Sequence, residues 1–222
     1  MSNKGNGTLM GHPKGLFLLF GTELWERFSY YAMRAILVLY LTDKTVSGGL
    51  GWSTEDALSL YGIYTGLVYI TPLIGGWVAD NFLGQRRSII IGGVLMALGQ
   101  FTLALPHSLV DPNATTAFYL GLALLIVGNG LFKPNISTMV GDLYAEGDHR
   151  RDGAFTIFYM GINLGALLAG IIAGSASTAY GWKAGFLAAG IGMLLKSCWA
   201  ILVKCLLPNV RPLCRTTERN SL

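Results

Sequence analysis

Long apolar runs dominate the chain, and short polar connections separate them. A hydrocarbon core of about 30 Å requires about 20 apolar residues in a helix. Six segments of this kind follow one another, and we place them at residues 16–41, 58–80, 87–106, 117–138, 153–175 and 183–206. The pattern therefore predicts an all-α, polytopic membrane protein, whose six transmembrane helices occupy residues 16–206 between tails of residues 1–15 and 207–222.

The charges of the connections predict how these helices are oriented. If the segments alternate across the membrane, most basic residues of the tails and connections fall on one side, namely Lys4, Lys14, Arg86, Arg87, Arg150 and Arg151. The other side holds only Lys44 and Lys183. Since cytoplasmic loops are enriched in Lys and Arg, we expect the N-terminal tail in the cytoplasm.

The first segment carries an unusual set of polar side chains. They recur at helical spacing on one face, at Glu23, Glu26, Arg27, Tyr30, Tyr31 and Arg34. Inserting four charges costs about 10 kcal/mol, whereas the apolar residues of the segment return about 5 kcal/mol. The face is therefore expected to meet protein or water and to line a cavity; a static ion pair that fixes helix packing is the alternative.

Depth relates this face to one residue of the fourth segment. At 1.5 Å per residue, Glu23 and Glu26 lie about 10–15 Å inside the first span, and Lys133 lies at a similar depth on a helix of opposite direction. A cluster of these side chains with Arg27 would contain groups whose charge depends on their neighbours, as proton coupling requires. Arg34 lies about 10–12 Å deeper, where it could hold a carboxylate. The alternative for Lys133 is a side chain that only extends to the membrane surface.

Two other features bear on function less directly. The turn between the second and third segments brings together Asp80, Arg86 and Arg87, which fits either a gating latch or an ordinary positively charged cytoplasmic loop. In the fifth segment, Asn163 is expected to be a buried amide that contacts either another helix or a substrate. Four glycines of that segment are expected to allow close helix packing: Gly161, Gly165, Gly170 and Gly174.

Composition agrees with a membrane protein and excludes several other classes. Hydrophobic residues make up 52% of the chain and charged residues only 13%, against about 25% charged residues in soluble domains. The net charge of +4 resides mainly in the connections, so no nucleic-acid partner is expected. No metal site or disulfide framework is predicted. An enzyme is not expected either, because GxSxG and HExxH motifs are absent and all three histidines fall outside the segments.

Three stretches resemble motifs of one transporter family. Residues 23–31, ELWERFSYY, resemble the ExxERFxYY signature of the proton-dependent oligopeptide transporter (POT) family of the major facilitator superfamily. Residues 128–135, GNGLFKPN, and residues 155–165, FTIFYMGINLG, resemble two further motifs of that family. Residues 76–87 resemble the loop motif of the superfamily, with Asn81 at a usually basic position. The resemblance implies the N-terminal half of a major-facilitator fold, built as a 3+3 inverted repeat.

The resemblance also implies residue roles. Glu23, Glu26, Arg27 and Lys133 would handle the proton, and the peptide site would be lined by Arg34, Tyr30, Tyr31, Tyr69, Lys133 and Asn163. The expected function is proton-coupled symport of di- and tripeptides in the cytoplasmic (inner) membrane of a bacterium, with protons as coupling ion and no cofactor. The expected partners are small peptides, the lipid bilayer and a C-terminal six-helix half. The alternatives are a major-facilitator transporter of another solute and a non-transporting membrane fragment.

The end of the chain departs from the family pattern. Lys196 and Lys204 place two charges in the sixth segment, and all three cysteines, Cys198, Cys205 and Cys214, fall in the last 25 residues. Family members have twelve or more spans. We therefore expect a truncation, or a frameshift from about residue 196, and no coupled transport by the 222-residue chain alone. A divergent sixth span is the alternative.

Overall fold

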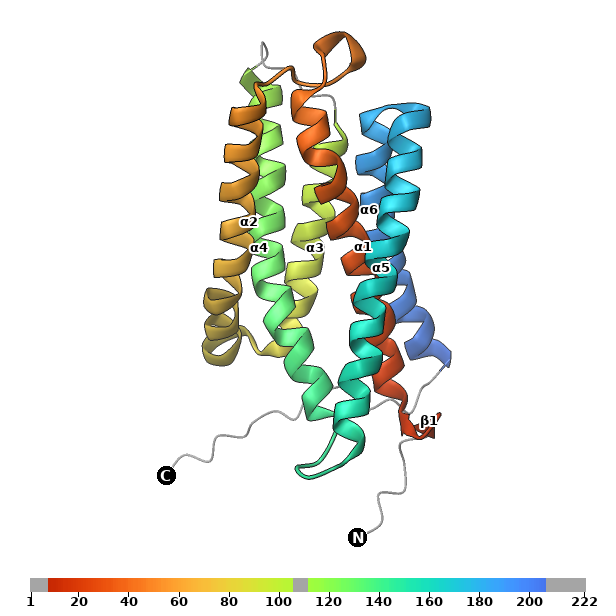
Figure 1. Ribbon diagram of the computed structural model, residues 1–222. Helices are drawn as coiled ribbons and strands as arrows, with labels where there is room; N and C mark the ends of the chain where they lie inside the picture. Colours follow the sequence, from red (N-terminus) through yellow and green to blue (C-terminus); the bar gives the residue numbers. More distant parts are fainter. Residues whose placement is uncertain (1–7, 106–111, 207–222) are drawn as a thin grey trace.

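The computed structural model describes residues 8–105 and 112–206, with side chains described in the second range for residues 115–196, 198 and 199. In this part the chain is helical apart from one small hairpin (Figure 1). Six long helices follow in order: α1 (Lys14–Thr42), α2 (Thr54–Val78), α3 (Gln85–Ala104), α4 (Pro112–Asp142), α5 (Arg150–Tyr180) and α6 (Trp182–Leu206). Each lies on an expected segment, with ends that differ by at most five residues.

Short elements join or precede these helices. A 3₁₀ turn, η1 (Thr45–Ser47), follows α1, and a π-helical turn, η2 (Ala79–Leu83), extends α2 toward α3. The strands β1 (Thr8–Leu9) and β2 (His12–Pro13) pair antiparallel ahead of α1. The expected N-terminal tail of residues 1–15 is thus corrected in its described part: residues 8–13 form a hairpin, and α1 already begins at Lys14.

Contacts with the connection between α4 and α5 hold this hairpin in place. The Nδ1 atom of His12 is hydrogen-bonded to the Tyr144 hydroxyl at 2.8 Å. The Nη1 atom of Arg150 donates to the backbone oxygen of Gly11 at 2.9 Å, and its Nη2 atom pairs with Asp148 at 2.7 Å. The hairpin is therefore tied to the start of α5.

The six helices form two triplets in chain order, α1–α3 and α4–α6, and the first helix of each packs mainly on helices of the other. The first helix of the first triplet, α1, packs mainly on α5 and α6, whereas α4 packs mainly on α2 and α3. Figure 1 shows α2 and α4 side by side at one edge of the bundle, and α1 beside α5 and α6 at the other. The first helix of each triplet thus lies against the other two helices of the opposite triplet.

Glycines bring the backbones close at the α1–α5 contact. A Cβ atom on Gly165 would lie 2.4 Å from the Leu24 carbonyl oxygen, and one on Gly161 would lie 3.0 Å from the Phe20 ring. The expectation of close packing is confirmed for these two positions. It is wrong for Gly170 and Gly174, whose Cβ positions meet nothing within 4 Å. The buried positions of α5, which we call its packing stripe, follow a four-residue spacing. After Gly161 and Gly165 the stripe continues at Ala169 and Ala173.

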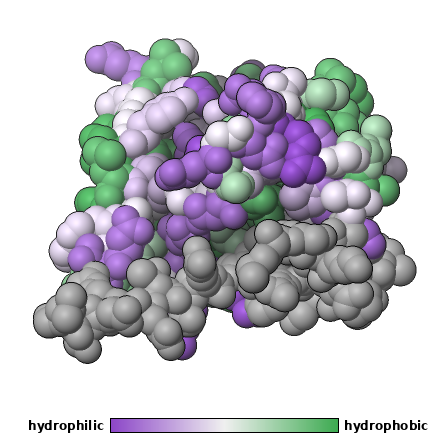
Figure 2. Space-filling view, turned by 90° about the horizontal axis from the view of Figure 1, so that it is seen from below, coloured by the Kyte–Doolittle hydropathy of each residue, from purple (hydrophilic) through white to green (hydrophobic). Residues whose placement is uncertain are grey.

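Helix composition and surface pattern identify an integral membrane protein. In the described part of the chain, four helices are long and apolar enough to cross a membrane: α2 with η2, α3, α4 and α5. Figure 2 shows the end at which α1, α3 and α5 begin, with hydrophilic residues across its middle and apolar residues at both sides. The first residues of these three helices include five basic ones, Lys14, Arg86, Arg87, Arg150 and Arg151. Their placement at the starts of three alternate helices agrees with the charge pattern of the sequence.

Candidate functional site

An ion-paired triad lies buried on α1. The side chains of Glu23, Glu26 and Arg27 belong to residues that are only 3%, 1% and 5% exposed. The Nε atom of Arg27 lies 3.0 Å from Oε1 of Glu23 and also pairs with Oε2 of Glu26. The expectation that these charges share one helix face and offset one another is confirmed. One guanidinium serves two carboxylates, which leaves an excess negative charge if both are ionised.

Helices α3 and α4 supply polar partners that the sequence did not single out. The side-chain amide of Asn129 on α4 donates to Oε1 of Glu26 at 3.3 Å. On α3, the amide of Gln100 donates to the backbone oxygen of Ser29 at 3.2 Å. A small cavity of about 10 Å³ lies between these residues and Tyr64, near the lower limit for one water molecule. Asn129 stands four residues before Lys133 and between two glycines, a signal that could have indicated its role.

Several polar atoms of this core keep unused bonding capacity. Among the described residues, Oε2 of Glu23, Nη2 of Arg27, Oδ1 of Asn129 and Nζ of Lys196 are buried without a hydrogen-bond partner. Buried polar groups are usually paired, and an unpaired one is explained by function, by strain or by a bound water or ion. The structure therefore adds Lys196, which the sequence analysis treated only as a departure from the family pattern.

Arg34 belongs to a second, more open group farther along α1. Its Nε atom donates to the hydroxyl of Tyr61 on α2, and its guanidinium carbon lies 5.3 Å from the centre of that ring. The Tyr30 ring lies 6.0 Å from the same carbon and 5.2 Å from the Tyr31 ring. Tyr61 was missed by sequence reasoning, although it lies on the same segment as the predicted Tyr69. The group presents a half-buried cation between aromatic rings.

Lys133 lies beside Tyr69, another residue predicted for the peptide site. Its Nζ atom lies 4.9 Å from the ring centre of Tyr69 on α2, a residue that is 60% exposed. Lys133 is within electrostatic reach of Glu23, but none of the ion pairs in the described part of the chain includes it. On the same helix, Asn129 and Phe132 are buried and face the triad side. The role of Lys133 in handling the proton remains a prediction.

Asn163 is exposed and donates to the backbone oxygen of Tyr159 at 3.1 Å within its own helix. The expectation of a buried amide is wrong, because the buried face of α5 runs through Gly161 and Gly165 instead. Among the described residues, the Asn163 side chain therefore has no hydrogen bond to the triad or to Arg34.

The residues of the expected gating turn are all exposed. Asp80 lies in η2, whereas Arg86 and Arg87 begin α3. Among residues 8–105 and 112–206, no ion pair involves Asp80, Arg86 or Arg87. Asn81 donates to the backbone oxygen of Trp77 at 2.8 Å, which holds it within its own turn. The gating latch remains a prediction for these residues.

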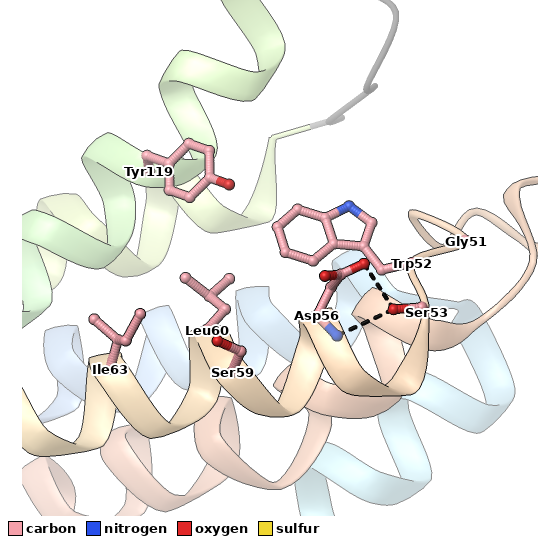
Figure 3. A pocket seen from close by; sticks show the side chains of 8 residues that line it. All are labelled: Gly51, Trp52, Ser53, Asp56, Ser59, Leu60, Ile63 and Tyr119. Carbon is pink, nitrogen blue, oxygen red and sulfur yellow. Dashed lines mark hydrogen bonds between the residues drawn. The ribbon is translucent and has the colours of Figure 1, made fainter.

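A larger hollow of about 590 Å³ lies where α2 begins, near the end of α1 farthest from Lys14. Trp52 and Tyr119 face it from two sides, and Asp56 lies below them (Figure 3). The Ser53 hydroxyl caps α2, since it accepts from the Asp56 backbone at 3.1 Å and donates to the Asp56 carboxylate at 2.6 Å. None of the predicted site residues lines this hollow.

Comparison with known proteins identifies relatives along most of the chain. A family profile described as PTR2, POT family, matches residues 86–201, just over half of the chain. The uncharacterized transporter YclF of Bacillus subtilis is 52% identical over 83% of this chain. A di-/tripeptide transporter of Lactococcus lactis is 47% identical over 86% of it. The chain spans 36% and 38% of the length of these two relatives.

Solved structures agree with these matches. A peptide transporter POT, an E310Q mutant in complex with alafosfalin, superposes with a TM-score of 0.84 at 45% identity. The match covers 91% of this chain and 41% of that one. A POT family transporter in complex with 5-aminolevulinic acid gives a TM-score of 0.83 at 41% identity, over 89% of this chain and 39% of that one.

Proposed function

Because the chain belongs to the POT family of transporters, we propose that it provides the N-terminal half of a proton-coupled symporter for di- and tripeptides. The observation that carries this proposal is the buried triad of Glu23, Glu26 and Arg27. Two carboxylates that share one cation in a membrane interior can exchange a proton with little change of structure. The di-/tripeptide transporter of Lactococcus lactis supports the choice of substrate.

The proposed architecture has six spans arranged as a 3+3 inverted repeat. The exchange of partners between α1 and α4 supports the repeat, since each packs on the last two helices of the other triplet. With 29 residues, α1 is about 44 Å long and could cross a core of about 30 Å. Its triad is turned inward, so lipid need not solvate these charges. The basic end shown in Figure 2 would face the cytoplasm.

The two groups of side chains suit two tasks. Glu23, Glu26 and Arg27 are nearly closed off from the surface, as a proton site requires. Arg34 and Lys133 lie in more open surroundings next to tyrosines, where they could bind the carboxylate of a peptide. The exposed Asn163 would reach the peptide from the surface of α5. The second half of the transporter would cover this open side.

Transport of another solute is the second candidate function. Its basis is one related transporter, whose structure was solved in complex with 5-aminolevulinic acid. That compound shares a carboxylate and an amino group with a dipeptide. It would therefore compete for the same cations. Side-chain or length selectivity would distinguish a peptide transporter from a transporter of small amino acids.

Uptake by a complete transporter tests the proposal. A chimera would join residues 1–206 to the C-terminal half of the Bacillus subtilis relative and be reconstituted in proteoliposomes. An inward proton gradient is expected to drive accumulation of a labelled dipeptide, and excess unlabelled di- and tripeptides should abolish it. Inhibition by 5-aminolevulinic acid but not by peptides would replace the peptide proposal with the second candidate, and accumulation without a gradient would refute proton coupling.

A further inference from the structure

Lys196 lies on α6 at the depth of the buried triad. Helix α6 runs antiparallel to α1, and two contacts fix their register. A Cβ atom on Gly192 would lie 2.4 Å from the Phe28 ring, and one on Gly21 would lie 2.1 Å from the Trp199 ring. Lys196 falls between these two contacts, level with the turn of α1 that carries Glu23 and Glu26.

Three helices form the surroundings of the Lys196 side chain. Its Nζ atom lies 3.9 Å above the centre of the Phe132 ring on α4. On α3, a Cβ atom at Gly93 would lie 2.7 Å from the same nitrogen, so the Lys196 side chain reaches the surface of α3 at this glycine. Lys196 is 7% exposed, and its nitrogen has no hydrogen-bond partner among the described residues. A buried ammonium of this kind is costly unless opposite charge lies close by.

The triad supplies that opposite charge. Glu23 and Glu26 both interact electrostatically with Lys196. If both carboxylates are ionised, the triad carries one excess negative charge, and a charged Lys196 brings the total to zero. On the other packed helices, Lys133 of α4 lies over Tyr69 instead, and α3 and α5 carry charges only in their exposed first turns. Lys196 is thus the remaining buried cation of the described core that can balance the triad.

We propose that Lys196 is the counter-charge that sets how many protons Glu23 and Glu26 hold. While Lys196 is charged, both glutamates stay ionised. When it is neutral or replaced by an uncharged residue, one glutamate keeps a proton. This inference deepens the proposed function by adding a positioning residue to the same proton site. It concerns protonation at rest, so it can be tested apart from transport.

The test uses the 222-residue chain in lipid nanodiscs and reads carboxyl protonation by infrared spectroscopy. At neutral pH, Lys196→Met is expected to gain the carbonyl band of one protonated carboxylic acid, and this gain should be absent in Lys196→Met combined with Glu23→Gln and Glu26→Gln. Lys183→Met, at an exposed position of the same helix, should gain no band. Lys196→Arg, which keeps the charge, should also gain none. A folded Lys196→Met protein without the additional band would overturn the proposal.

A second measurement keeps Lys196 itself intact. Nitrogen NMR of ¹⁵N-labelled lysine, with the Lys196 signal assigned from Lys196→Arg, reports whether its amine is charged. In Glu23→Gln the triad no longer has excess negative charge, so Lys196 should lose its proton at a pH at least about one unit lower than in the unaltered chain, a tenfold change in proton affinity. An unchanged titration would show that Lys196 does not balance the triad. Neither reading depends on peptide uptake, so failed uptake would refute only the proposed function.

Discussion

The side-chain amide of Asn129 on α4 donates a hydrogen bond of 3.3 Å to the carboxylate of Glu26 on α1. These helices open the two triplets, and they make few other contacts with each other. The bond therefore joins the triplets directly at the buried triad. It also fixes one Glu26 oxygen, while Arg27 holds the other.

Loss of this bond should weaken the bundle. Asn129→Ala leaves a buried carboxylate oxygen without its donor, which is expected to cost about 1.5–3 kcal/mol of unfolding free energy. Denaturant unfolding of the chain in mixed micelles would measure it. Asn163→Ala is the matched control, since that exposed amide bonds only within its own helix, and a change below about 0.5 kcal/mol is expected. Equal effects of the two substitutions would contradict the role of Asn129.

The α1–α5 contact should depend on one glycine and not on another. Gly165→Ala would push a Cβ atom against the Leu24 carbonyl oxygen, at 2.4 Å, and is expected to destabilise the fold by about 1–3 kcal/mol. Gly170→Ala on the same helix meets open space and should stabilise by up to about 1 kcal/mol through helix propensity. The same unfolding assay compares the two variants. A stabilising Gly165→Ala would show that the helices do not approach as described.

Tyr61 should position Arg34 for substrate. Tyr61→Phe removes the hydroxyl that accepts from the guanidinium, and a lost hydrogen bond to a charged group corresponds to about a tenfold or greater loss of affinity. In the chimera, the KM for a dipeptide should rise by about this factor, with a much smaller change in maximal rate. Tyr180→Phe, at an 84% exposed position, serves as control. An unchanged KM in Tyr61→Phe would exclude this role.

The N-terminal hairpin should detach in acid. Hydrogen bonds from Arg150 lower the pKa of Asp148 to about 2, from an ordinary value near 3.9. A lowered pKa means that the contact stabilises the folded hairpin above about pH 4 and is lost as the pH falls through about 2. Hydrogen exchange of residues 8–13, corrected for intrinsic rates, should therefore stay slow down to about pH 4 and then accelerate.

Substitution provides the same test at neutral pH. Asp148→Asn should accelerate exchange of the hairpin, because Arg150 loses its ion pair and with it the fixed orientation toward Gly11. Asp142→Asn, at an exposed position six residues earlier, should leave exchange unchanged. Identical exchange in both variants would mean that Asp148 does not hold the hairpin.

The helices and the charged face of α1 could be predicted from the sequence for a simple reason. Apolar runs of about 20 residues and one-faced polar spacing are properties of single helices, so no knowledge of neighbours is needed. The ion pairing of Glu23 and Arg27, four residues apart, is local in the same sense.

Contacts between helices could not be predicted in the same way. Lys133 and Lys196 are both lysines inside apolar segments. Only the packing of the helices places one over the Tyr69 ring and the other over the Phe132 ring. Asn163 was misplaced because spacing shows which residues share a face but not which face is buried. Gly170 and Gly174 were misjudged because alanines continue the packing stripe of α5.

Gradient-driven uptake with Glu26 altered tests the central claim most directly. In the chimera, Glu26→Gln should abolish accumulation of a labelled dipeptide under an inward proton gradient, while exchange of labelled for unlabelled dipeptide without a gradient continues. Asp142→Asn should accumulate peptide as the unaltered chimera does. Accumulation by Glu26→Gln at the unaltered rate and extent would contradict the assignment of the buried triad to proton coupling.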